Sequence, residues 1–126
     1  MEKNEVLYDG LSDFWSRSSP VLFPIVGKLK DNKYKLDHNI YELNQHGFAR
    51  DNEFSIIEQK DGLLILAFRS NSETMKLFPC DFELQISYAI NGPRISVAYK
   101  VVNHGETNMP FSIGAHPGFN CPISQN

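Results

Sequence analysis

The sequence predicts an all-β protein, built as an antiparallel β-sandwich. Apolar and polar residues alternate with a period of two between Cys80 and Ile90, as they do in a half-buried strand. Asp-Gly and Asn-Gly dipeptides separate apolar runs and are typical of hairpin turns. No stretch of ten residues has the period of an amphipathic helix. With 41% hydrophobic residues, a chain of 126 residues can bury one modest core, so we expect a single domain over residues 1–126.

The clearest element is a hairpin between Phe82 and Val101. The apolar positions of its first strand are Phe82, Leu84, Ile86, Tyr88 and Ile90, and those of its second strand are Ile95, Val97, Tyr99 and Val101. Between the strands, Asn91-Gly92 supplies the positive φ of a tight turn, and Pro93 blocks further ladder pairing there. We therefore expect two long antiparallel strands joined by a short turn.

Two further pairs of short apolar runs also predict hairpins. These are residues 53–58 with residues 63–69, and residues 33–36 with residues 40–43. Asp61-Gly62 forms the turn of the first pair, and Asp37-His38-Asn39 forms the turn of the second, which should be exposed.

A third strand is expected beyond the long hairpin, from Pro110 to His116. Phe111, Ile113 and Ala115 would face the core, and His116 would lie on the opposite face because side chains alternate along a strand. The chain ends soon afterwards, which leaves the edge of this strand uncovered. The sequence therefore reads as part of a larger sandwich.

An apolar stretch near the N-terminus is interrupted by two prolines. Pro20 and Pro24 lie in or beside the run that ends at Gly27. Because proline cannot donate to a sheet ladder, we expect this stretch to be an edge strand or a loop. Residues 1–32 as a whole have less regular patterns than the rest of the chain.

Composition excludes several classes of function. The net charge is −3, with Lys and Arg scattered among Asp and Glu, so neither nucleic acid nor an anionic membrane is expected as a partner. The longest apolar run, Leu63 to Phe68, is too short to cross a bilayer, and no signal-peptide core follows Met1. Cys80 and Cys121 lack metal-type spacing. We expect a cytoplasmic location, free thiols, no cofactor and a small ligand.

Two of the four histidines are candidates for chemistry. His116 has small neighbours, including Gly114, which leave room for a ligand, and His46 precedes Gly47 with Arg50 four residues on. His38 and His104 lie in polar turns and are expected to be solvated. No third metal ligand, nucleophile elbow or phosphate-binding glycine loop accompanies the pair. Lys28 and Lys30 are either surface charges or ligand contacts.

Several motifs occur in a specific order along the chain. They are Ser19 to Gly27, His46-Gly47-Phe48, Asp81 to Leu84, Asn91-Gly92, Val102-Asn103, Met109-Pro110-Phe111 and His116 to Asn120. In these motifs the chain resembles the aldose 1-epimerase (galactose mutarotase) superfamily, in particular the mutarotase-like branch associated with lactose operons and the related hexose-phosphate epimerases. The resemblance implies a galactose mutarotase-like β-supersandwich of more than twice this length. Residues 1–126 are then a partial domain that lacks an opening strand pair and the C-terminal half.

The resemblance also implies a reaction, the interconversion of the α and β anomers of a hexose by acid–base ring opening. His116 resembles the histidine acid that protonates the ring oxygen, and His46 the second active-site histidine. Lys28, Arg50 and Asn120 are the implied sugar contacts. Lys28 stands where galactose mutarotases have an arginine, whose planar fork an ammonium cannot reproduce. Arg50 could compensate, particularly for a phosphorylated sugar.

The implied glutamate base and sugar-binding aspartate belong to the C-terminal half of the family. The chain alone is therefore expected to be inactive or weakly active. Its implied partners are a hexose or hexose phosphate, and either further copies of itself or a complementing C-terminal half. Two alternatives remain: a non-catalytic sugar-binding or sensing module, and a structural β-domain with incidental histidines.

Overall fold

The computed structural model describes residues 7, 8, 10, 13 and 15–120. In this part of the chain the elements are β1 (Val21–Leu22), η1 (Lys30–Asn32), β2 (Lys33–Leu36), β3 (Asn39–Glu42), η2 (Ala49–Asp51), β4 (Ser55–Lys60), β5 (Leu63–Arg69), α1 (Ser72–Leu77), β6 (Phe82–Asn91), β7 (Arg94–Asn103) and β8 (Gly114–Ala115). Strands β4, β5, β6 and β7 form one sheet in that order, β2 pairs with β3, and β1 pairs with β8. All these pairs are antiparallel, which confirms the predicted all-β class.

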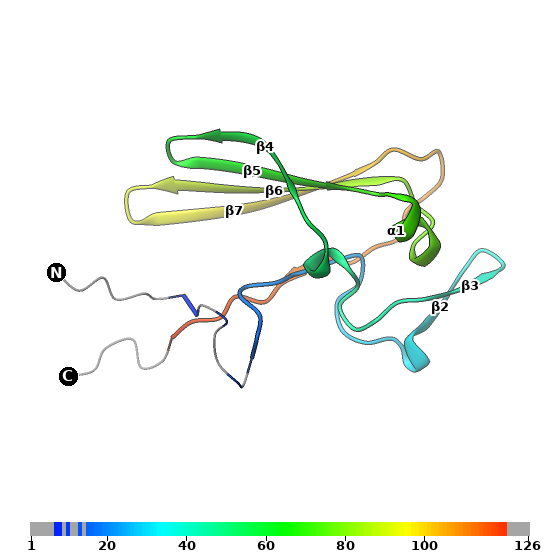
Figure 1. Cartoon of the computed structure of the whole chain (residues 1–126). Coiled ribbons are helices and arrows are strands. Elements are labelled where there is room, and N and C mark those ends of the chain that lie inside the picture. Colours follow the sequence, from blue (N-terminus) through cyan, green and yellow to red (C-terminus); the bar gives the residue numbers. More distant parts are fainter. Residues whose placement is uncertain (1–6, 9, 11–12, 14, 121–126) are drawn as a thin grey trace.

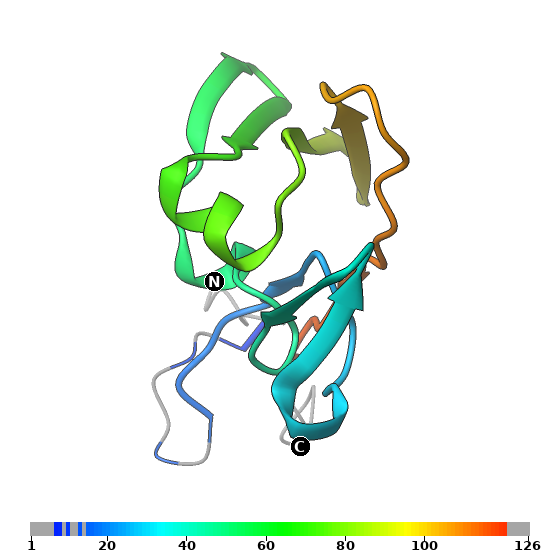
Figure 2. The same cartoon turned by 90° about the vertical axis from the view of Figure 1, so that its right-hand side faces the viewer.

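The four-stranded sheet forms one layer, and the β1–β8 pair and the β2–β3 hairpin lie below it in Figure 1. Figure 2 shows the same arrangement along the strands, with α1 at the end of the sheet. None of the helices in the described residues is long and apolar enough to cross a membrane.

The three predicted hairpins are all present. In the longest, Phe82 pairs with Asn103 and Asn91 with Arg94, and Gly92 has the positive φ of 56° that its turn requires. Strand β5 has the predicted bounds, whereas β4 begins at Ser55 and contains a register shift between Ile56 and Glu58. These elements were predictable because alternation and turn residues act over a few neighbouring positions.

The strand predicted from Pro110 to His116 is shorter, because only Gly114–Ala115 is paired as a strand. The N–H groups of Ser112 and His116 nevertheless donate to the carbonyls of Pro24 (2.9 Å) and Pro20 (3.1 Å). The ladder is interrupted because Pro24 has no N–H to donate. The hydroxyl of Ser112 instead accepts from the N–H of Val26, at 2.9 Å. The predicted edge character of the proline-flanked stretch is confirmed in the two-residue strand β1.

A short helix, α1, was not predicted. Its N-cap is Asn71, whose side chain accepts from the N–H groups of Glu73 and Thr74, both at 3.0 Å. The Thr74 hydroxyl in turn accepts from the N–H of Asn71, which completes a capping box. Six residues are too few to show a helical period, so the capping residues were the available signal.

The core is a cluster of aromatic rings between β1, η2 and one end of the four-stranded sheet. Phe23 and Phe82 are both fully buried, with ring centroids 5.0 Å apart. Phe78, which follows α1, packs on both rings. Phe48, in the loop before η2, stacks on Phe82. Full burial of each phenylalanine side chain stabilises the folded state by about 1.5–3 kcal/mol.

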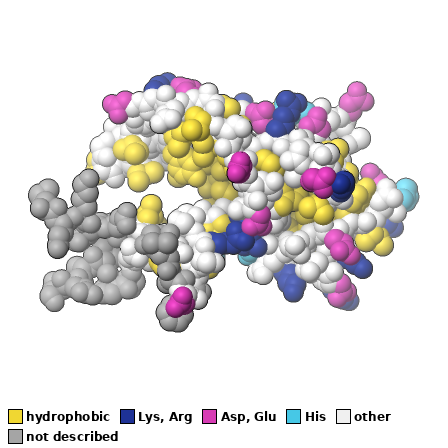
Figure 3. Space-filling model, in the orientation of Figure 1, with side chains coloured by type: hydrophobic (Ala, Val, Ile, Leu, Met, Phe, Trp, Pro, Cys, Tyr) yellow, Lys and Arg dark blue, Asp and Glu magenta, His cyan; other side chains and the backbone are white. Residues whose placement is uncertain are grey.

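The inner face of the sheet becomes progressively exposed away from this core. Paired residues share a face, so the buried face that carries Ile86 continues along β6 and β7 toward the Asn91–Arg94 turn. Ile86 is 2% exposed, whereas Ile95 near the turn is 61% exposed. We call the exposed end the uncovered strip; it consists of Ile56, Ile90, Ile95, Val97 and Tyr99. Figure 3 shows hydrophobic side chains gathered on the underside of this layer.

Gly47 is predicted to be indispensable for the fold. It has a φ of 70°, and a Cβ built on it would lie 2.3 Å from the carbonyl oxygen of Phe23. Gly47→Ala should therefore lower the free energy of unfolding by about 3 kcal/mol or more, measured by urea denaturation. The control is Gly92→Ala, where φ is also positive but no atom lies within 4 Å, with an expected cost of about 1 kcal/mol. Equal costs would show that the close approach to Phe23 is unimportant.

Candidate functional site

The fold brings His46 and His116 together. Their ring centroids lie 6.3 Å apart, with an angle of 32° between the ring planes. The N–H of His116 donates to the carbonyl of Pro20, and the N–H of His46 donates to the carbonyl of Gly27, at 3.1 and 2.8 Å. The two histidines are thus attached to the two ends of one short segment, residues 20–27. His116 is exposed, and His46 is partly buried.

The turn that carries His46 has an unusual backbone. His46 has a φ of 68°, in the left-handed region that non-glycine residues rarely adopt, and Gly47 follows with a φ of 70°. The N–H of Gly47 donates to the carbonyl of Asn44 at 2.9 Å. The N–H of Gly27 also donates to Nδ1 of the His46 ring at 3.0 Å. The ring and the backbone of His46 are therefore both tied to Gly27.

The surroundings of His46 lower its pKa from the ordinary value of 6.5. The largest cause is partial removal of the ring from water, followed by repulsion from Arg50 and from His116. His46 is therefore neutral over more of the physiological pH range than a free histidine. A neutral imidazole donates one hydrogen bond and accepts another.

Aromatic residues from the N-terminal region pack beside His116. The ring of Trp15 meets the His116 ring edge-on, with centroids 5.7 Å apart, and Tyr8 stacks on Trp15 at 5.6 Å. Gly118 makes room for this pair, because a Cβ there would lie 2.7 Å from the Trp15 ring. Sequence reasoning missed Trp15, and its only signal was that it is the single tryptophan of the chain.

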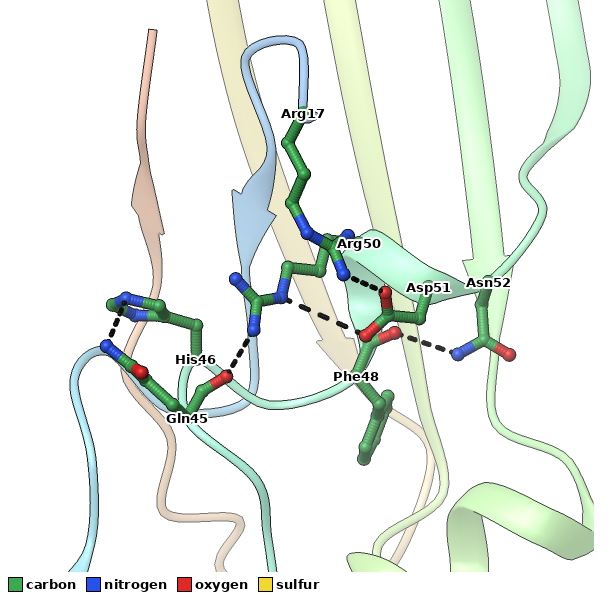
Figure 4. Close-up of polar contacts among 7 residues, drawn as sticks. All are labelled: Arg17, Gln45, His46, Phe48, Arg50, Asp51 and Asn52. Carbon is green, nitrogen blue, oxygen red and sulfur yellow. Dashed lines mark hydrogen bonds and ion pairs between the residues drawn. The ribbon is translucent and has the colours of Figure 1, made fainter. Parts of the chain in front are cut away.

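The Arg50 side chain lies between the His46 turn and Asp51 (Figure 4). Its Nη2 donates to the carbonyl of Gln45 at 2.7 Å, and its Nε lies 3.9 Å from a carboxylate oxygen of Asp51. Arg17 pairs with the other oxygen of that carboxylate at 2.7 Å. The Arg50 side chain is 19% exposed. Arg50 thus lies beside the candidate site with Nη2 bound to Gln45 and with Nε buried without a hydrogen-bond partner.

The other two predicted sugar contacts lie on either side of the histidine pair along the chain. Lys28 is exposed and directly follows Gly27, which binds His46. The side chain of Asn120 donates to the carbonyl of Leu7 at 3.1 Å, next to an antiparallel bridge between Leu7 and Phe119. Asn120 therefore binds the main chain at Leu7, next to Tyr8, which stacks on Trp15.

The remaining candidates lie elsewhere. His38 is exposed in the turn between β2 and β3, and Nε2 of His104 lies 3.8 Å from Glu83. Cys80 is a buried free thiol, and Cys121 lies outside the described residues. Within the described residues, no group of three or more His, Cys, Asp or Glu side chains could hold a metal ion.

A surface hollow beside the sheet does not include the histidine pair. It is lined by Asp51, Asn52, Glu53, Ser55, Ala67, Phe68, Arg69 and Asn71. Partly buried His46 and exposed His116 lie outside this hollow.

Comparisons with known proteins show which family the chain resembles in sequence and fold. The sequence profile of the family described as "Aldose 1-epimerase" matches residues 2–126. The chain is 33% identical over 130 aligned residues to the plasmid and chromosomal forms of Protein LacX from Lactococcus lactis subsp. lactis. The alignment covers 94% of this chain and 42% of LacX.

Solved structures of similar proteins have the same fold. A galactose mutarotase related enzyme from Lactobacillus acidophilus is 36% identical, with a TM-score of 0.90 over 93% of this chain. A galactose mutarotase-like protein from Lactobacillus casei ATCC 334 is 37% identical, with a TM-score of 0.87 over 91% of this chain. Each comparison covers 39% of the longer protein, so the chain spans about two fifths of the length of these relatives. The profile match over nearly the whole chain shows that this protein belongs to the aldose 1-epimerase family.

Proposed function

We propose that this chain carries the acid part of an aldose 1-epimerase site and binds a hexose at the face shared by His46 and His116. The observation that supports this most directly is the convergence of the two imidazoles, 6.3 Å apart, from opposite ends of the segment 20–27. Two hydrogen-bonding rings at this spacing can contact neighbouring oxygens of one sugar ring. Family membership supports the proposed reaction class, and the convergence of the two imidazoles supports the proposed roles.

In the proposed reaction, the imidazolium of His116 gives its proton to the ring oxygen while the bond from that oxygen to the anomeric carbon breaks. A base takes the proton of the anomeric hydroxyl, which becomes the aldehyde of the open-chain sugar. Rotation of the aldehyde and closure on its other face reverse both transfers. Histidine suits this role because its ordinary pKa of about 6.5 lets it lose and regain a proton near neutral pH.

We propose that the base comes from outside this chain. The contacts described for the two imidazoles involve Gly27, Gln45 and Trp15, and none of these offers a carboxylate. General-base assistance contributes on the order of 10²–10⁴-fold to such a reaction. The chain alone should therefore bind sugar with little turnover. This same observation favours the alternative function, a sugar-binding or sensing module.

The expected partners follow from the same reasoning. A hexose or hexose phosphate is the proposed ligand, and exposed Lys28 is the proposed contact for a phosphate, since Arg50 is already engaged. The proposed macromolecular partner is a complementing polypeptide with the remaining β-structure of the fold, which would cover the uncovered strip. We place the protein in the cytoplasm, in keeping with the free thiol of Cys80.

The chain alone should leave the mutarotation of α-glucose and α-galactose at the buffer rate, followed by polarimetry. Fusing it to the remaining part of the Lactobacillus acidophilus relative should accelerate the reaction, and His116→Gln in the fusion should remove on the order of 10²–10⁴-fold of the rate. His104→Gln is the matched control and should leave the rate unchanged. Acceleration by the chain alone that disappears in His116→Ala would show that it contains a working base.

Sugar binding should be visible without turnover. Titration with galactose, glucose or glucose 6-phosphate should shift the imidazole NMR signals of His46 and His116 in a saturable way and leave those of His38 in place. Lys28→Gln should weaken the binding of glucose 6-phosphate by roughly tenfold, because it removes one charge-assisted contact. It should change the binding of glucose little. Unshifted His46 and His116 signals at saturating concentrations of all three sugars would contradict the binding proposal.

The uncovered strip should cause self-association. Light scattering of the chain should show an apparent mass that rises with concentration, because exposed apolar surface is removed from water on association. The double substitution Ile95→Thr and Val97→Thr should reduce this effect. Ile40→Thr is the matched control, because Ile40 is 70% exposed but lies on the separate β2–β3 hairpin. A monomeric mass at every concentration would contradict the prediction.

A further inference from the structure

The hydrogen bond from Gly27 to His46 determines where the imidazole carries its proton. A main-chain N–H can only donate, so the Nδ1 atom that lies 3.0 Å from the Gly27 nitrogen must accept. In a neutral imidazole the single N–H is then on Nε2. The N–H of His46 returns a bond to the carbonyl of Gly27 at 2.8 Å, so two bonds between the same residues fix the ring against the backbone.

This assignment determines the orientation of the Gln45 amide. Its Nε2 is placed 3.3 Å from Nε2 of His46, where two donors would face each other. Side-chain amide oxygen and nitrogen are assigned from such contacts, so Oε1 belongs at this position and accepts from the His46 N–H. Gln45 is exposed and can turn away when a sugar oxygen takes its place. The amide thus occupies the site of the sugar oxygen in the free protein.

Arg50 acts on the same imidazole from the other side. Its Nη2 donates to the carbonyl of Gln45, the residue before His46, and its Nε lies 3.9 Å from the Asp51 carboxylate. Partial removal from water, the charge of Arg50 and the ring of His116 all oppose protonation of His46. A second proton on His46 would also have to sit on Nδ1, against the N–H of Gly27.

We infer that Gly27 and Arg50 are positioning residues that hold His46 as the neutral Nε2–H tautomer, so that His46 donates a hydrogen bond to the sugar while His116 alone transfers the proton. The catalytic half of this inference rests on the proposed function. The structural half does not, because the tautomer is a property of the sugar-free chain.

Long-range ¹H–¹⁵N NMR of the 126-residue chain with ¹⁵N-labelled histidine tests the structural half. The signals lost in His46→Gln identify His46. They should show an unprotonated Nδ1 and a protonated Nε2 at neutral pH, and their titration midpoint should lie below 6.5. A protonated Nδ1, an equal mixture of tautomers, or a midpoint at or above 6.5 would overturn the inference.

The Arg50 variants separate positioning from a merely structural role. Arg50→Gln should raise the titration midpoint of His46 because one opposing charge is lost, and Arg50→Lys should restore the low midpoint. Arg94→Gln, at the distant β6–β7 turn, is the charge-matched control and should not move it. An unchanged midpoint in a folded Arg50→Gln protein would show that Arg50 does not help to keep His46 neutral. If this variant does not fold, the tautomer of the unmodified chain still decides the role of Gly27.

Addition of galactose distinguishes this inference from the proposed function. Bound sugar should shift Nε2 of His46 and leave Nδ1 unprotonated. A sugar that shifts neither histidine contradicts the proposed function, whereas the tautomer in the free chain supports or overturns the positioning independently. Sugar-induced protonation of Nδ1 would assign proton transfer to His46 and overturn the division of roles.

Discussion

The packing of Phe23 is the constraint on which the rest of the structure depends. Its ring is fully buried among the core phenylalanines, 5.0 Å from Phe82 of the large sheet. Its carbonyl accepts from the N–H groups of both Phe48 and Ala49, at 3.0 and 3.1 Å. One residue therefore joins the sheet to the loop that follows His46. Because the backbone approaches so closely there, the neighbouring position on the loop has to be Gly47.

This constraint connects the core to the candidate chemistry. The segment that contains Phe23 binds His116 through Pro20 and His46 through Gly27, so the spacing of the two rings is set by main-chain hydrogen bonds. Side chains on a backbone held in this way need little reorganisation to meet a ligand, which is what a proton donor and a hydrogen-bond donor require. We propose different roles for the two rings because they have different partners: His46 is bound by Gly27, whereas exposed His116 is contacted by Trp15.

The two ends of the large sheet differ in how far their inner face is buried. Near Phe82 the inner face is closed by aromatic rings, and near Ile95 it is open. The chain has the proposed acid and hydrogen-bond donor on a well-packed scaffold, and the relatives it matches are about two and a half times as long. In the proposed function, further β-structure on the open face would complete both the core and the acid–base pair, which would link binding, turnover and self-association.

The sequence by itself determined the fold class, the three hairpins and the two histidines as candidates. These follow from alternation over a few residues, from Asn91-Gly92 and Asp61-Gly62, and from the order of motifs along the chain. Only the tertiary structure showed that His46 and His116 are neighbours, that Arg50 is bound to Gln45 and Asp51, and that Trp15 lies against His116. For the histidine pair and for Trp15 the physical reason is separation along the chain: turn and strand preferences are local, whereas these rings come from distant segments that meet only in the folded chain. The Arg50 contacts are close in sequence, but they depend on the irregular turn at His46 and Gly47, which no strand pattern predicts.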